Sequence, residues 1–202
     1  MIHTMVRSLS VSIMSLTLFV PLVRAQDQSS KVQSPKDALA LKTSAFKDHE
    51  YIPAKYGCDI PQAQGTPMIS PPLEWSNAPK GSVTFALIMH DMGPDPKRVL
   101  DPNKLDVTHW VVFDIPATVN SLPEGVPVGA AVQGGIQGAN VHDVNGYQAP
   151  CPRGVGPHYY VFDLYALDAK VNLPPGASRT DLLKAMQDHI IAQTTYTGLY
   201  NH

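Results

Sequence analysis

The sequence is poor in charge, in glycine and in cysteine, and each scarcity excludes a class of protein. Of 202 residues, 15 are Lys or Arg and 17 are Asp or Glu, so a net charge of −2 provides no basic surface for nucleic acid. The 14 glycines are too few for a collagen repeat, and the sparse charges do not fit a coiled coil. A hydrophobic content of 44% excludes a wholly disordered chain. The length predicts one domain with a core of its own.

Proline, in contrast, is abundant. The chain has 19 prolines, roughly twice the average usage of about 5%. Because proline breaks helices and central strands, this composition predicts a loop-rich β protein rather than a helical bundle.

The apolar run near the N-terminus has the layout of an export signal. Arg7 precedes an apolar stretch over residues 9–20, and small or medium residues lead to a cleavage site after Ala25. The alternative is a membrane anchor, but the run is shorter than the roughly 20 residues that a spanning helix needs. Pro21 and Arg24 also interrupt it.

These features divide the chain into three parts. We expect a signal peptide at 1–25, a flexible N-terminal segment at 26–38 and a folded domain at 39–202. The mature protein is then exported, either periplasmic or secreted, with no stable membrane insertion after cleavage.

Cys58 and Cys151 are the only cysteines, and both would remain after cleavage. An even count in an oxidising compartment favours a disulfide. Closing a loop of this length contributes about 4–5 kcal/mol in the chain-entropy account. The alternative is two free thiols packed as small apolar side chains.

Short apolar runs separated by turn-rich loops predict a β-sandwich or mixed-sheet fold. The expected strands are 39–41, 51–56, 73–75, 83–89, 110–115, 159–167 and 194–200. The strand at 159–167 is apolar on both faces, which predicts a central strand covered on both sides.

One peripheral helix is expected after Ser178. Ser178 and Asp181 form the Ser-x-x-acid pattern of a capping box, in which each side chain satisfies a free backbone N–H group. Apolar residues then recur at helical spacing: Leu182, Leu183, Met186, Ile190 and Ile191.

Titratable residues gather at the ends of the predicted strands. Asp91 follows one strand, His109 begins the next, and His158 begins the long central strand that also carries Tyr160. A Gly- and Pro-rich loop at 146–154 precedes His158. Imidazoles, a phenol and loop amides can together bind a small anion. The alternative is that the histidines are hydrogen-bonded structural residues and that Asp91 caps a turn.

Six segments occur in the order found in one known family. They are IPAKYxCD at 52–59, SPPLEW at 70–75, FALI at 85–88, HWVV at 109–112, GYxxPCP at 146–152 and HxYxFxLYALD at 158–168. Over about residues 39–200 the sequence resembles the phosphatidylethanolamine-binding protein family, in its bacterial branch of Raf-kinase-inhibitor-like proteins.

The resemblance implies an antiparallel β-sandwich with a few peripheral short helices and a small anion pocket at one end. It assigns the pocket to a set of residues that match the family's motifs: Asp91, His109, Pro150, Pro152, His158 and Tyr160. It also places both cysteines near the mouth of the pocket. Two departures stand out: Asp-Met-Gly at 91–93 replaces Asp-Pro-Asp, and Ala149 replaces glycine. Loss of one acid makes the pocket less negative, which favours an anion.

The resulting expectation is an exported, non-enzymatic binding protein for a phosphate or a phospholipid-headgroup-like anion, without a cofactor. It could inhibit a kinase or a protease. One alternative is a metal-dependent enzyme, such as a hydrolase, with a His/His/Asp site, although no close-spaced pair such as HExxH occurs. Another is an interaction module whose pocket is vestigial. A nucleophilic hydrolase is disfavoured because no Gly-x-Ser-x-Gly elbow is present.

Overall fold

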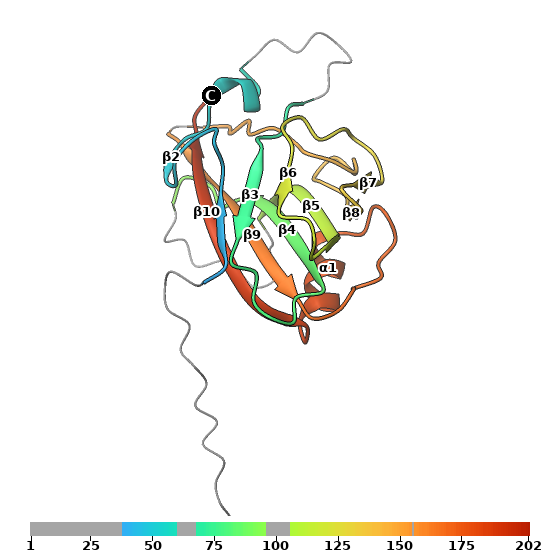
Figure 1. Cartoon of the computed structure of the whole chain (residues 1–202). Coiled ribbons are helices and arrows are strands. Elements are labelled where there is room, and N and C mark those ends of the chain that lie inside the picture. The colour runs from blue at the N-terminus through green and yellow to red at the C-terminus, as the bar shows by residue number, and fades with distance from the viewer. Residues whose placement is uncertain (1–37, 60–67, 96–105, 155) are drawn as a thin grey trace, which may run out of the picture. The chain divides into compact units, whose positions relative to one another are not determined.

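The computed structural model describes residues 38–59, 68–95, 106–154 and 156–202. The predicted signal peptide and nearly all of the predicted flexible segment lie outside these residues. The described part is mainly β, as the sequence predicts, with its strands in two sheets (Figure 1). Among the described residues, no helix has the length and apolar character needed to cross a membrane.

The smaller sheet has the order β1-β3-β6 and is antiparallel. Its strands are β1 (Ala40–Lys42), β3 (Leu73–Ser76) and β6 (Ser121–Leu122).

The larger sheet has seven strands in the order β2-β10-β9-β4-β5-β8-β7. They are β2 (Glu50–Tyr51), β4 (Thr84–Asp91), β5 (Val107–Pro116), β7 (Ala131–Val132), β8 (Gly135–Gln137), β9 (His158–Leu167) and β10 (Ile190–Tyr200). Among the strand pairs of the described residues, β2–β10 alone is parallel.

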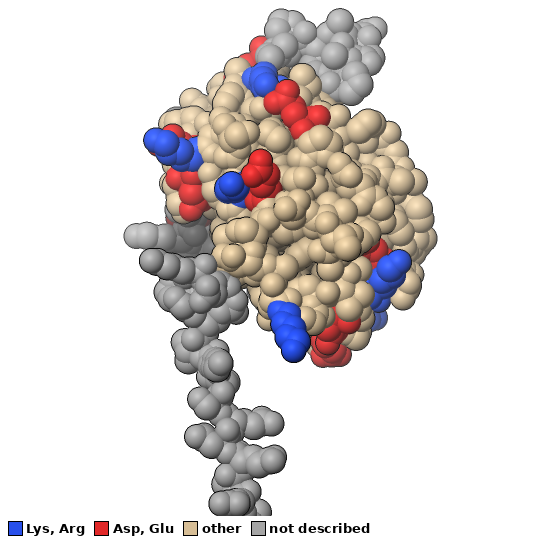
Figure 2. Space-filling model, in the orientation of Figure 1, with Lys and Arg blue, Asp and Glu red and all other residues tan. Residues whose placement is uncertain are grey.

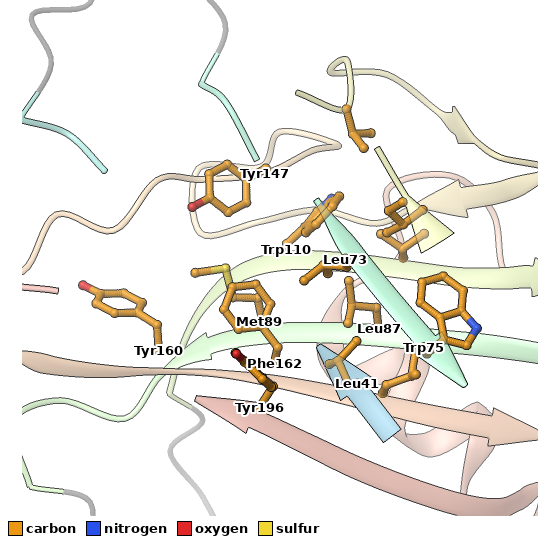
Figure 3. Packing of buried hydrophobic residues seen from close by; sticks show 14 of the residues in the cluster. Leu41, Leu73, Trp75, Leu87, Met89, Trp110, Tyr147, Tyr160, Phe162 and Tyr196 are labelled. Carbon is orange, nitrogen blue, oxygen red and sulfur yellow. The ribbon is translucent and has the colours of Figure 1, made fainter. Parts of the chain in front are cut away.

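The main core lies between the two sheets (Figure 3). Leu41, Leu73 and Trp75 of the small sheet pack in one cluster with Leu87 and Phe162 of the large sheet. Burial of such side chains is worth about 1.5–3 kcal/mol each before the entropy cost of ordering them. The sandwich therefore forms because both sheets present an apolar face.

Strand β9 has the two-faced character that its sequence predicts. Tyr160, Phe162 and Leu164 belong to the main core, whereas Tyr165 and Leu167 belong to a second buried cluster on the opposite face. The strand lies between β10 and β4, so the prediction of a central position is confirmed.

The helix α1 (Arg179–Met186) covers that second cluster with Leu182 and Met186. Its capping box is confirmed: the Asp181 N–H donates to Ser178 Oγ over 3.1 Å, and the Ser178 N–H donates to Asp181 Oδ2 over 3.3 Å.

Two boundary predictions are wrong. The helix ends at Met186, and Ile190 and Ile191 begin β10 instead, because a tight turn intervenes in which the His189 N–H donates to the Met186 carbonyl. The run at 51–56 is not one strand, because Pro53 has a fixed φ and no N–H to donate.

In place of that single strand, β2 ends at Tyr51 and a short 3-10 helix, η1 (Ala54–Tyr56), follows. Charged side chains are scattered over the face of the molecule in Figure 2, with both signs interspersed.

Candidate functional site

The predicted pocket residues meet where β4, β5 and β9 lie side by side. Asp91 is the last residue of β4 rather than a residue beyond it, and it pairs with Tyr160 in β9 and with Val107 in β5. Strand β5 begins at Val107, so His109 lies within the strand rather than at its start. The antiparallel register therefore gathers residues that are about 70 positions apart in sequence.

Asp91 and His158 form a hydrogen-bonded pair that is largely buried. His158 Nδ1 lies 2.9 Å from Asp91 Oδ2 and 3.0 Å from Oδ1, and the Gly93 N–H donates to Oδ1 over 2.6 Å. Because a carboxylate accepts, Nδ1 of His158 carries the proton and Nε2 remains for another partner. Asp91 is thus both a turn cap and the anchor of His158.

His109 is held by the backbone of the neighbouring loop. Its Nδ1 donates to the Gln148 carbonyl over 2.8 Å, and the Gln148 N–H donates back to the His109 carbonyl over 2.8 Å. Burial lowers the pKa of His109 below its usual 6.5, although the Gln148 carbonyl and the charge of Asp91 oppose this. The ring is therefore neutral at pH 7, with its lone pair on Nε2.

Tyr160 provides a buried phenol next to this imidazole. The rings of His109 and Tyr160 meet edge to face, with centroids 5.1 Å apart. The Tyr160 hydroxyl is buried and makes no hydrogen bond of acceptable geometry, although Asp91 and the Cys151 backbone lie near enough to act on it. Burial and the charge of Asp91 raise the pKa of Tyr160, so the phenol stays protonated.

Three contacts hold the loop at 146–154 to residues 56–58. Cys58 and Cys151 form the disulfide favoured by the sequence, with Cα atoms 5.4 Å apart. The Cys58 N–H donates to the Pro150 carbonyl over 3.0 Å, and Tyr147 Oη donates to the Tyr56 carbonyl over 2.8 Å. Figure 3 shows Tyr147 and Tyr160 at the same end of the main core.

Pro150 and Pro152 are both buried in this loop, which runs from the Gln148 contact with His109 to the start of β9 at His158. The structure thus brings Asp91, His109, His158 and Tyr160 together, with the two prolines in the adjoining loop. Gln148 was not predicted, because a contact made by a backbone carbonyl leaves no mark on residue type.

Among the described residues, His109, His158 and Asp91 do not form the metal-binding group that the metal-enzyme alternative requires. Within the described ranges, the group of Cys, His, Asp or Glu residues whose ligand atoms converge closely enough is Cys58, Cys151 and His202. Nδ1 of both pocket histidines is already committed, one to Asp91 and one to the Gln148 carbonyl.

A second histidine network, absent from the sequence predictions, lies elsewhere on the same sheet. The buried His90 places Nδ1 3.0 Å from Asp106 Oδ2 and Nε2 3.1 Å from Asp163 Oδ2. Thr195 Oγ1 donates to Asp163 Oδ1 over 2.7 Å. Because carboxylates accept hydrogen bonds, each ring nitrogen of His90 faces an acceptor.

Comparison with known proteins gives one consistent family. The family described as phosphatidylethanolamine-binding protein matches residues 42–201. A UPF0098 protein of Methanothermobacter thermautotrophicus is 43% identical over 162 residues, which cover 79% of this chain and 97% of the relative. A Mycobacterium tuberculosis protein named as a candidate lipoprotein, LppC, is 29% identical, covering 90% of this chain and 81% of its own.

Solved structures agree with this match. Escherichia coli YbcL, described as a member of the mammalian PEBP family, superposes with a TM-score of 0.67 at 27% identity, covering 81% of this chain and 98% of its own. The homologue CT736 of Chlamydia trachomatis gives 0.66 at 34% identity, covering 82% and 99%. The chain therefore belongs to the phosphatidylethanolamine-binding protein family.

Proposed function

We propose that this chain is an exported binding protein that takes a small phosphate-like anion at the junction of β4, β5 and β9. The observation that carries the proposal is the buried Tyr160 hydroxyl, which lacks a well-formed hydrogen bond and lies next to the His109 ring. A buried donor left without a partner costs about 1–3 kcal/mol. An anion oxygen at this position would satisfy it.

The two histidines favour the same ligand. Nδ1 is occupied in both rings, so Nε2 of His109 and of His158 remains for a ligand. The negative charge of Asp91 is offset by His158 and by the Gly93 N–H, which reduces its repulsion of an anion. The groups available to a ligand are thus two imidazole nitrogens and one phenol, which can hold a phosphate or a phosphorylated headgroup.

Binding is coupled to a proton. The pKa of His109 is lowered by burial, so its Nε2 accepts rather than donates at pH 7. An anion must therefore either bring a proton of its own, as a monohydrogen phosphate does, or bind together with proton uptake by His109. Affinity for phosphate consequently rises as pH falls below about 6.5.

We assign no bond-breaking step to this site. Its side chains are imidazole, phenol and carboxylate, and Cys151 is held in the disulfide. The disulfide and the similarity to the lipoprotein-like LppC support export.

Calorimetry tests the proposal with inorganic phosphate and phosphoethanolamine, in one buffer below and one above about pH 6.5. We expect tighter binding at the lower pH, and weaker binding in Tyr160→Phe and His109→Gln. His189→Ala is the control, because His189 pairs with the exposed Asp168. Absence of binding in both buffers, or tighter binding at the higher pH, refutes the proposal. Stoichiometric zinc or iron that is lost in His158→Ala would favour the metal enzyme.

A further inference from the structure

The indole of Trp75 is buried, but its N–H group has no acceptor among the described residues. Trp75 is 3% exposed and packs at a steep angle on Phe85, with ring centroids 5.5 Å apart. Its Nε1 makes no hydrogen bond with any group in the ranges that the structure describes. The second tryptophan of the chain behaves in the usual way, because Trp110 Nε1 donates to Gln137 Oε1 over 2.9 Å. Trp75 therefore carries a buried donor that these residues leave unused.

A cavity of about 300 Å³ lies beside this ring, where β3 ends and β4 begins. Its lining includes Trp75, Ala78, Phe85, Ala117, Val119 and Asn120. Figure 3 shows the indole nitrogen on the side of the ring that is turned away from Leu87 and Leu41. The donor thus points out of the main core, toward the end of the sandwich that holds this cavity.

We propose that this cavity binds a small uncharged molecule through a carbonyl oxygen that accepts from Trp75 Nε1. An indole N–H can only donate, so the ligand must supply the acceptor. The Phe85 ring and the side chains of Ala117 and Val119 give the cavity apolar walls, against which an alkyl group next to the carbonyl would pack. Amides, esters and ketones with a short alkyl substituent combine these two features.

The charges around the cavity favour a neutral ligand. Among the described residues that line it, none is charged. Lys42 and Glu74 line a neighbouring hollow, but they pair with each other, with 3.1 Å between Nζ and Oε2. An anion or a cation in the cavity would lose its water without gaining a counter-charge, which is costly. A carbonyl compound loses less on leaving water and gains the hydrogen bond to Trp75.

The rim of the cavity is accessible although its floor is buried. Asn77, Ala78 and Asn120 are exposed, whereas Trp75 lies beneath them in the core. Asn77 Nδ2 donates to the Ala38 carbonyl over 3.1 Å, which ties one side of the rim to the start of the described domain. A ligand therefore reaches the indole by displacing exposed rim side chains, and the strands of both sheets stay in place.

This cavity is separate from the proposed anion pocket. Phe85 and Asp91 lie near opposite ends of β4, and a rise of about 3.4 Å per residue places them about 20 Å apart. Figure 3 likewise shows Trp75 and Tyr160 at opposite ends of the labelled core residues. The two sites share no residue, so each can be tested without the other.

Nuclear magnetic resonance of the isotope-labelled full chain, titrated with N-isopropylacetamide, tests this inference. The two indole N–H groups give separate signals, and Trp75→Phe identifies which is which. In the free protein, the Trp75 indole proton should resonate upfield of the Trp110 proton, because it lacks a hydrogen bond. During the titration it should move downfield until the site is saturated. The Trp110 signal should stay in place, so it serves as an internal control.

Two variants separate the hydrogen bond from the cavity. Trp75→Phe should weaken binding about three- to tenfold, the value of one hydrogen bond. Ala78→Leu, at the exposed rim, should weaken it at least about tenfold, because the larger side chain fills the mouth. Ala54→Leu is the matched control, because Ala54 is an exposed alanine in η1 that does not line the cavity. It should bind like the wild type.

A Trp75 signal that does not move, an equal shift of both indole signals, or unchanged affinity in Ala78→Leu overturns the inference. So does a Trp75 indole proton that already resonates beside that of Trp110 in the free protein, because another group then accepts its hydrogen bond. None of these outcomes affects phosphate binding at the junction of β4, β5 and β9.

Discussion

Two clusters of histidine and aspartate lie on the same sheet, and they differ in how completely they are satisfied. In the closed cluster, both nitrogens of His90 meet carboxylates, and Asp163 also accepts from Thr195. In the pocket cluster, His109 and His158 each use one nitrogen, and the Tyr160 hydroxyl lacks a well-formed hydrogen bond. The same residue types therefore stabilise a fold where both nitrogens of the ring are bonded and leave capacity for a ligand where one nitrogen remains.

The largest effect should come from opening the closed cluster. His90→Ala removes the buried imidazole that bonds both Asp106 and Asp163, which should lower the free energy of unfolding by about 3–5 kcal/mol. Urea denaturation followed by circular dichroism measures this. His158→Ala is the comparison, and its partly accessible pair should cost less than half as much.

Equal losses of stability in the two variants would contradict the contrast between the two clusters. The contrast is supported further if folded His90→Ala keeps its affinity for phosphate while His158→Ala loses it.

Removal of the disulfide should be the next largest effect. In Cys58→Ser/Cys151→Ser, the denatured chain regains the freedom of a 93-residue loop, which should cost about 2–5 kcal/mol of stability. Because Cys151 lies in the pocket loop, phosphate binding should weaken as well. Thermal unfolding and calorimetry report the two losses. A variant that unfolds like the wild type would contradict the first, and one that binds phosphate unchanged would contradict the second.

The two clusters should also lose stability in different ranges of pH. The pKa of His109 is lowered, so the unfolded chain takes up its proton first, and stability falls as pH drops from 6.5 toward the folded pKa. Burial acts to raise the pKa of Asp163, but hydrogen bonds from His90 and Thr195 outweigh it. The stability that Asp163 contributes is thus present above pH 3.8 and is lost as pH falls through its lower folded pKa.

Unfolding free energies measured across this pH range separate the two contributions. In His109→Gln, the free energy of unfolding should depend less on pH just below pH 6.5, and its decrease at acid pH should be unchanged. If the pH dependence just below pH 6.5 persists in His109→Gln, a group other than His109 causes it.

The smallest change in stability is expected for Tyr160→Phe. Removing a buried hydroxyl that lacks a well-formed hydrogen bond should leave the free energy of unfolding unchanged or raise it by about 1 kcal/mol, because an unsatisfied buried donor is destabilising. Phosphate affinity should nevertheless fall by about three- to tenfold, the value of one hydrogen bond. A stability loss above about 2 kcal/mol would mean that the hydroxyl is satisfied within the protein.

Local patterns predicted much of this structure. The alternation along β9 and the capping box at Ser178 depend on neighbours in sequence, and both hold. The same reasoning failed at Ile190 and Ile191, because their spacing continues the helical pattern after the helix has ended.

The closed cluster could not be predicted in this way. His90 is 16 residues from Asp106 and 73 from Asp163, so only the strand register brings them together. Asp91, His109, His158 and Tyr160 stand out in the sequence at the ends of predicted strands, but only the family resemblance assigned them to one pocket. The contact between Gln148 and His109 depends on a backbone atom, which residue type does not specify.

The disulfide has a consequence for biogenesis. Strands β3, β4 and β5 all lie between Cys58 and Cys151, so under the export proposed above an emerging polypeptide carries a single thiol until most of the large sheet has crossed into an oxidising compartment. With only two cysteines, oxidative maturation has one intramolecular product and needs no isomerase to sort wrong pairings. The one incorrect product that remains is a disulfide between two chains. A stalled translocation product should therefore accumulate as a covalent dimer through Cys58.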